Sequence, residues 1–253
     1  MTTGAVAAAR IDLPDTSKAL LFTRNSIKID RVADWDVWEV DKHMYDLVRG
    51  PGVRSSTMYK PSVDKHLPQA LRANCRRAVS YRASDLPEMR KWLDSDVLAD
   101  AVEDGRTWRD AYDPLEDQWF TGNVYRLVKG VGVDFPVSSH IVIERYEVGH
   151  ALASEFEKWL ESYLKQLAAV VGVEAVQSYV MVTDIGNQLY LSPGNYALLL
   201  AIPAADDPVA RLTTPSALKA FRSSQDWELR LPYQRRELYT AAAHMFAPDG
   251  GEK

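Results

Sequence analysis

Cysteine is nearly absent from this chain: Cys75 is the single one among 253 residues, so no intrachain disulfide can form. This usage is typical of a reducing compartment, and we predict a cytoplasmic protein in which Cys75 is a buried, unreactive thiol. No run approaches the ~20 apolar residues of a membrane-spanning helix. The N-terminal MTTGAVAAAR lacks the basic and apolar regions of a signal peptide. We therefore expect no membrane partner.

An excess of one charge is also missing. The 30 basic and 35 acidic residues leave a net charge of -5, and a weakly acidic chain is not attracted to nucleic acid. A composition of 46% hydrophobic and 26% charged residues is ordinary for a globular protein. The sequence has no GxGxxG, GxxxxGK[ST], HExxH, GxSxG or CxxC, so the common nucleotide, zinc-protease, hydrolase and dithiol signatures are all absent.

What the chain does contain is an order of predicted elements that occurs twice. Strand-like patterns cover 18–29, 53–60, 74–83, 118–128, 138–148, 173–182, 195–204 and 235–246. Helical patterns cover 33–49, 86–105, 151–172 and 206–223, the last despite Pro215, and 129–136 reads as a linker. We predict an α+β fold of two βαββαβ ferredoxin-like repeats, at 18–130 and 137–247, with flexible ends at 1–17 and 248–253.

Individual residues repeat as well. Trp38 lies 14 positions before Gly52, and Trp159 lies 13 positions before Gly172. A valine follows each glycine, and a strand bearing an aromatic residue follows each valine. Similar spacing in both halves indicates that one supersecondary unit is present twice.

The segment DWDVWEVDKHMYDLVRGPGV (34–53) resembles the dimeric α/β-barrel superfamily, which includes EthD-like proteins, antibiotic-biosynthesis monooxygenases and small polyketide cyclases. The matching residues are Trp38, Asp41, His43, Pro51-Gly52-Val53 and the strand that ends at Tyr59. The resemblance implies that two sheets close into one barrel-like core. Single-copy relatives would do so as two subunits. Here the second half would take the partner's place, giving an intramolecular pseudo-dimer that could self-associate further.

His43 is the first catalytic candidate. A histidine at the edge of a cleft can act as a general acid or base because its pKa is near neutrality. The alternative is a histidine that only orients the end of its helix. The second half has Leu164 at the corresponding spacing, so one of the two equivalent clefts would keep the group.

The aromatic strands supply the other candidates. Alternation places Tyr81 on one strand face with Arg77, and Tyr125 on another with Trp119 and Asn123. Such polar, aromatic faces could line a pocket, in which Tyr59, Tyr81 and Arg77 are catalytic candidates and Trp38, Trp119, Asn123 and Tyr125 are substrate-binding candidates. The alternative is that the rings fill the core and their hydroxyls reach solvent at its edge.

A metal site is a further alternative. His140 and Glu144 share a face of one predicted strand, and His244 ends a strand expected to lie beside it. Two imidazoles and a carboxylate would suit a transition metal. They could equally be unrelated neighbours at a sheet edge, and we expect no metal.

Three functional hypotheses follow. The resemblance implies cofactor-free cyclisation, elimination or oxygenation of a small apolar aromatic or polyketide-like molecule. His43 would move the proton, while Tyr59, Tyr81 or Arg77 would stabilise the oxyanion. A second hypothesis is a haem enzyme with His140, His244 or His43 as the iron ligand. The third is a non-catalytic binding module whose aromatic faces are only core.

Overall fold

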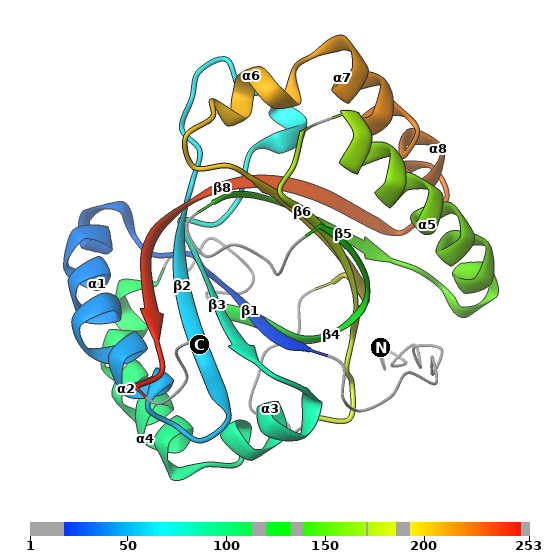
Figure 1. Cartoon of the computed structure of the whole chain (residues 1–253). Coiled ribbons are helices and arrows are strands. Elements are labelled where there is room, and N and C mark those ends of the chain that lie inside the picture. The colour runs from blue at the N-terminus through cyan, green and yellow to red at the C-terminus, as the bar shows by residue number, and fades with distance from the viewer. Residues whose placement is uncertain (1–17, 113–119, 133–138, 171, 186–192, 249–253) are drawn as a thin grey trace, which may run out of the picture.

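The eight strands form one closed barrel. The computed structural model describes residues 18–112, 120–132, 139–170, 172–185 and 193–248, so the segments at 1–17 and 249–253 lie outside the described residues. Around the barrel the strand order is β1-β3-β2-β8-β5-β7-β6-β4 (Figure 1). The strands are β1 (Ala19–Asn25), β2 (Val53–Pro61), β3 (Arg77–Ala83), β4 (Phe120–Gly132), β5 (His140–Glu147), β6 (Ala175–Met181), β7 (Tyr196–Ile202) and β8 (Tyr233–Phe246). Closure leaves no sheet edge unpaired, and the predicted α+β barrel is confirmed.

Each half has the same strand order. In the first half it is β4-β1-β3-β2, and in the second it is β8-β5-β7-β6. Two antiparallel seams join the halves, β2 with β8 and β4 with β6. The second seam uses residues 129–132, which we had assigned to a linker but which extend β4 alongside β6. The chain is therefore an intramolecular pseudo-dimer, as the repeat predicted.

Helices cover the outside of the barrel in two groups (Figure 1). The first half contributes η1 (Ile29–Arg31), α1 (Val32–Trp38), η2 (Glu39–Met44), α2 (Tyr45–Val48), η3 (Gln69–Leu71), α3 (Leu86–Leu93), α4 (Asp96–Gly105) and η4 (Arg106–Ala111). The second half contributes η5 (His150–Leu152), α5 (Ala153–Val170), α6 (Pro208–Leu212), α7 (Pro215–Arg222) and α8 (Gln225–Glu228). No helix in these described stretches has the length and apolar character needed to cross a membrane.

Two helices predicted as continuous are each divided by a cap. Ser95 accepts a hydrogen bond from the Leu98 amide and starts α4, so 86–105 is two helices. Thr214 caps α7 in the same way, and Pro215 occupies the first turn, where its missing N–H costs nothing. The interpretation of 206–223 as one helix was therefore wrong, because Pro215 begins a helix instead of interrupting one.

The apolar residues form three clusters. One fills the barrel and includes Phe22, Tyr59, Tyr125 and Tyr239. The other two lie between the sheet and the helices, one in each half. Because successive strand residues point to opposite faces, a shift of one position moves a side chain from the barrel interior to a helix–sheet layer.

Candidate active site

The residues predicted as one site lie on two faces of the sheet. Trp38 and Tyr81 belong to the helix–sheet layer of the first half, whereas Tyr59 and Tyr125 point into the barrel. Inside the barrel, Tyr125 accepts a hydrogen bond from Asn123 (3.0 Å) and donates one to the Gly194 carbonyl (3.1 Å). The Tyr125 hydroxyl is thus satisfied by the protein itself. Trp119 lies outside the described residues.

His43 packs between helices rather than against the sheet. Its ring stacks on Trp38, with centroids 4.5 Å apart and planes at 28°, and lies next to Gly105 at the end of α4. Desolvation lowers the pKa of His43 to about 4, against a smaller raising effect of Asp104, so the imidazole is neutral at pH 7. Its Nδ1 is buried without a hydrogen-bond partner in the part of the chain that the structure describes. Its role in proton transfer remains a prediction.

Arg77 holds a helix to the sheet. Its Nε and Nη2 donate to the two carboxylate oxygens of Asp36 on α1, at 2.5 and 2.7 Å, and Lys60 Nζ lies 3.1 Å from the same carboxylate. Burial raises the pKa of Asp36, but Arg77 and Lys60 outweigh it and the net pKa is lowered. The bidentate pair therefore fixes α1 on the start of β3.

The three metal candidates are not brought together. His140 Nδ1 lies 2.9 Å from Thr240 Oγ1, and His244 Nδ1 lies 2.8 Å from Thr57 Oγ1. In the antiparallel register His140 faces Thr240, so His244 is four residues, about 13 Å, further along β8. Among the described residues no group of three His, Cys, Asp or Glu side chains could hold a metal.

Glu39 is the group that the sequence analysis missed. It lies in η2, a π-helical turn between α1 and α2, and its side chain faces the sheet with 2% exposure. Tyr81 on β3 donates a hydrogen bond to Oε1 at 3.3 Å. Burial raises the pKa of Glu39 to about 8, and the negative charge of Asp36 adds to the shift. The sequence did carry a signal for this burial: Glu39 lies four positions after the apolar Trp35, and residues i and i+4 share a helix face.

Other polar groups surround this carboxyl. Burial raises the pKa of Tyr81 and of Tyr112, and the charge of Glu39 raises both further, so both phenols are close to it. The Ser56 hydroxyl lies near Tyr81, whose pKa it lowers slightly. Ser56 Oγ and Trp35 Nε1 are fully buried without a hydrogen bond of normal geometry within the described ranges. The layer thus holds an acid and polar atoms that a bound oxygen atom could satisfy.

The second half provides an internal comparison. Its helix–sheet layer also contains a buried carboxylate, Glu144, but Arg236 donates to it twice, at 2.6 and 3.2 Å. Tyr163 and Tyr146 complete its hydrogen bonds. Glu144 is neutralised and saturated, whereas Glu39 has no cationic partner in the described part of the chain. A difference of this kind marks Glu39 as the chemically available carboxyl.

A further charged cluster, also missed, lies at one end of the barrel interior. Glu237 accepts hydrogen bonds from Arg24 (3.1 Å), Arg145 (3.2 Å) and Arg235 (3.1 Å), and from the Asn74 amide (3.1 Å). Burial raises the pKa of Glu237, but the arginines outweigh this and lower it overall. The cluster ties residue 74 to β8. Next to it Cys75 is buried, as predicted, with Sγ 3.2 Å from the Tyr239 hydroxyl.

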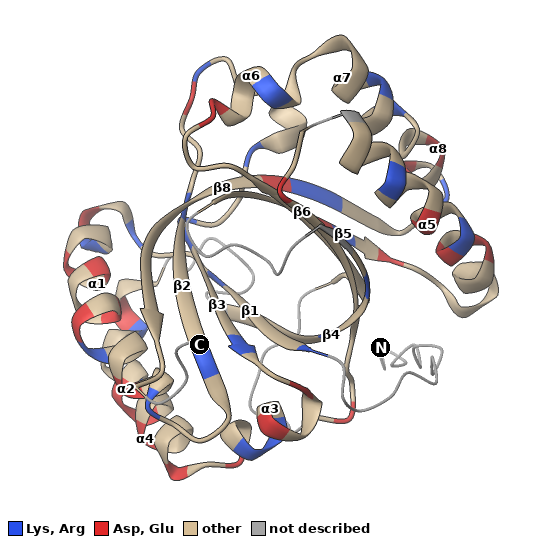
Figure 2. Ribbon diagram, viewed as in Figure 1, with Lys and Arg blue, Asp and Glu red and all other residues tan. Residues whose placement is uncertain are grey.

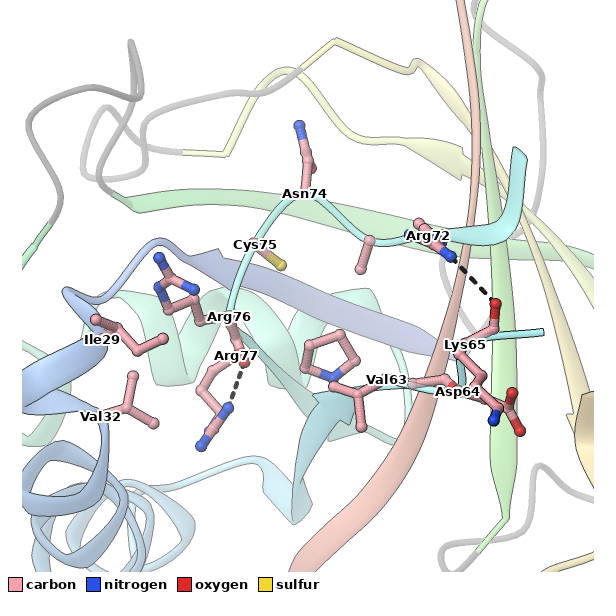
Figure 3. A pocket seen from close by; sticks show the side chains of 13 residues that line it. Ile29, Val32, Val63, Asp64, Lys65, Arg72, Asn74, Cys75, Arg76 and Arg77 are labelled. Carbon is pink, nitrogen blue, oxygen red and sulfur yellow. Dashed lines mark hydrogen bonds between the residues drawn. The ribbon is translucent and has the colours of Figure 1, made fainter. Parts of the chain in front are cut away.

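A pocket of about 650 Å³ opens at the start of the helical segment that carries Glu39. Ile29 and Val32 line one side of it and Val63 the other, with Arg77 between them (Figure 3); Pro61 also lines it. In the haem hypothesis, His43, His140 or His244 would have to face such a space to bind the iron. None of the five histidines lines this pocket, so it offers no histidine ligand to an iron.

Comparisons with known proteins agree with the architecture. No family model and no curated protein matches the sequence. Among solved structures, an anthrone oxidase-like protein superposes with a TM-score of 0.62 at 10% identity, covering 93% of this chain and 95% of the other. Candidate monooxygenases from Fusobacterium nucleatum subsp. nucleatum ATCC 25586 (TM-score 0.57, 9% identity, 91% and 95%) and Lactobacillus acidophilus NCFM (0.54, 10%, 91% and 97%) are similar too. At these identities the likeness shows the fold, and the chain has the dimeric α/β-barrel fold.

Proposed function

We propose that this dimeric α/β-barrel protein is an enzyme that removes a proton from a small, mainly apolar aromatic ketone or phenol, with Glu39 as the base. The observation that carries the proposal is the pKa of about 8 for a fully buried carboxyl that lacks a cationic partner among the described residues. A general base is most effective when its pKa is near the working pH. Glu39 meets this condition, whereas His43, with a pKa of about 4, is a weaker base.

The surrounding groups suit the charge that proton removal creates. Loss of a proton from a carbon conjugated with an aromatic carbonyl leaves negative charge on the carbonyl oxygen. The Ser56 hydroxyl lies beside Tyr81 and the Trp35 indole N–H lies beside Tyr112, neither in a hydrogen bond of normal geometry within the described residues, and either could turn to bind that oxygen. Tyr81 would orient the Glu39 carboxylate through its hydrogen bond.

The aromatic walls of the layer favour a planar, apolar substrate. Tyr81 packs on Trp92 with ring centroids 5.2 Å apart, and Trp35 packs on Trp38 at 6.1 Å. One structural neighbour is anthrone oxidase-like, and anthrone has the required acidic C–H next to two rings. Glu39 would take that proton, and the resulting enolate would reduce dioxygen. One anthrone and one dioxygen would give one anthraquinone and one water.

Access to Glu39 requires movement. With Glu39 2% exposed, a substrate reaches it only when residues 32–48 separate from the sheet. The 650 Å³ pocket opens at the start of this segment, and Arg77, which lines it, is bonded to Asp36 on the same segment. A π-helical turn, which is frequent at functional sites, interrupts the segment at Glu39.

The test is oxygen consumption with anthrone as the probe substrate. We expect Glu39→Gln to lower kcat at least 100-fold, since general-base catalysis contributes about 10²- to 10⁴-fold, and Tyr81→Phe to have a smaller effect. Asp41→Asn, on the exposed side of the same turn, is the matched control and should leave kcat unchanged. Equal rates for Glu39→Gln and wild type would refute the proposal. If His43→Leu lowers kcat and Glu39→Gln does not, the base is His43.

A further inference from the structure

The pocket beside α1 has a chemical character of its own. It lies between the first turns of the helical segment, at Ile29 and Val32, and the connection from β2 to β3 (Figure 3). Its volume of about 650 Å³ falls in the range of sites for small organic molecules. The connection is held in place at its far end, where the Asn74 amide donates to Glu237 inside the barrel.

Positive charge dominates its lining. Four cations, Lys65, Arg72, Arg76 and Arg77, face one carboxylate, Asp64. This contrasts with a net charge of -5 for the chain and with the many acidic residues on α1, α2 and α4 (Figure 2). Because low-dielectric walls focus the field of such a cluster, the pocket attracts anions.

Three of these cations are not neutralised by the protein. Arg77 is bonded to Asp36, but Lys65, Arg72 and Arg76 have no carboxylate partner among the described residues. Within the described ranges, Arg72 donates to the Leu67 and Lys65 carbonyls, at 3.4 and 3.5 Å, which orient its guanidinium without supplying a negative charge.

Exposed apolar side chains border the same pocket. Ile29 is 76% exposed and Val63 is 92% exposed, and Val32 and Pro61 lie next to them. Covering apolar surface of this kind is favourable in proportion to the area removed from water. An anion without an apolar body would leave these side chains in water.

We infer that this pocket binds a small organic carboxylate with an apolar body. Arg76 would bind the carboxylate, Arg72 and Lys65 would add to the positive field, and Ile29 and Val63 would cover the body. An aromatic acid and a medium-chain fatty acid share this chemistry. The inference does not depend on catalysis by Glu39.

Isothermal titration calorimetry of the full chain tests it, with 2-naphthoate and octanoate as the two acids and neutral 2-naphthamide as the matched ligand. We expect at least one acid to bind tenfold or more tightly than 2-naphthamide and to lose affinity as NaCl rises from 50 to 500 mM. The acid that binds more tightly shows whether the pocket prefers an aromatic acid or a fatty acid. Equal affinity for acid and amide, or no binding of either acid, would overturn the inference.

Variants locate the site. Arg76→Gln should weaken binding of the preferred acid about tenfold, and Ile29→Ser should weaken it several-fold. Arg222→Gln, an exposed arginine on α7 of the other half, should not change it. Glu39→Gln should bind like wild type, which separates this inference from the proposed reaction. Unchanged affinity in Arg76→Gln, with a wild-type circular dichroism spectrum, would refute the assignment. Binding of inorganic phosphate as tight as that of the acid would also refute it.

Discussion

The Tyr81 hydroxyl donates a hydrogen bond of 3.3 Å to the Glu39 carboxyl, across the interface between β3 and the π-helical turn. In the other half, Glu144 occupies a similar layer but is bound by Arg236 at 2.6 Å. These two buried carboxyls have opposite character. Glu144 is paired with a guanidinium, whereas burial favours the protonated form of Glu39 at pH 7.

The first prediction concerns Glu39 and pH. Its pKa is about 8 in the folded chain and about 4.3 in the unfolded chain. Between these values the folded state binds more protons, so stability falls as pH rises, by up to about 1.4 kcal/mol per pH unit from this group. Urea unfolding of wild type and Glu39→Gln at pH 5.5 and pH 8.5 should show the variant gaining relative stability at the higher pH. A constant difference would contradict the assigned pKa.

The second prediction has the opposite sign. The pKa of His43 is about 4 in the folded chain, below its unfolded value of about 6.5. Between these values the unfolded state binds more protons, so His43 favours folding more as pH rises and costs stability at pH 5. We expect His43→Leu, which copies Leu164 of the second half, to be more stabilising at pH 5 than at pH 7.5 in thermal unfolding. His150→Leu, in an exposed turn, is the control.

The third prediction tests whether Glu144 has a structural role that depends on its ion pair with Arg236. Arg236→Met leaves Glu144 buried without its cation and should cost about 3–5 kcal/mol. The double variant Glu144→Gln with Arg236→Met should recover part of that loss, because no uncompensated charge remains. Denaturant unfolding of the two single variants and the double variant measures the coupling. Additive effects would show that the pair acts as two independent groups.

The fourth prediction concerns the attachment of α1. Asp36→Asn removes the charge that binds both Arg77 and Lys60, and it should cost about 2 kcal/mol. The loss should be local, with faster hydrogen exchange in residues 32–48. Asp46→Asn, which removes an exposed ion pair with Lys42 on the same segment, should have little effect. Unchanged exchange in Asp36→Asn would mean that packing alone fixes the segment.

Much of the fold could be predicted because its signals are local. The spacing of Trp38 from Gly52 and of Trp159 from Gly172 indicated a duplicated unit, and strand-like patterns marked all eight strands. Gly52 and Gly172 both have positive φ, of 93° and 65°, which explains why glycine ends the helical segment at the same point of each half.

The candidate site could not be assembled in the same way. Alternation correctly paired Arg77 with Tyr81 and Asn123 with Tyr125, but it could not show that these pairs face opposite sides of the sheet. In β2 the register shifts between Val53 and Ser55, so residues two apart no longer share a face there. Face assignment depends on how the whole barrel closes.

The sequence by itself determined the element order, the duplication and the absence of a disulfide framework, because these follow from nearest-neighbour patterns and composition. The tertiary structure alone decided which carboxyl is unusual. Glu39 and Glu144 are both glutamates next to aromatic residues, and only packing supplies Arg236 to one and Tyr81 to the other. The pKa of a buried group depends on what surrounds it in three dimensions, and that information is carried by residues distant in the chain.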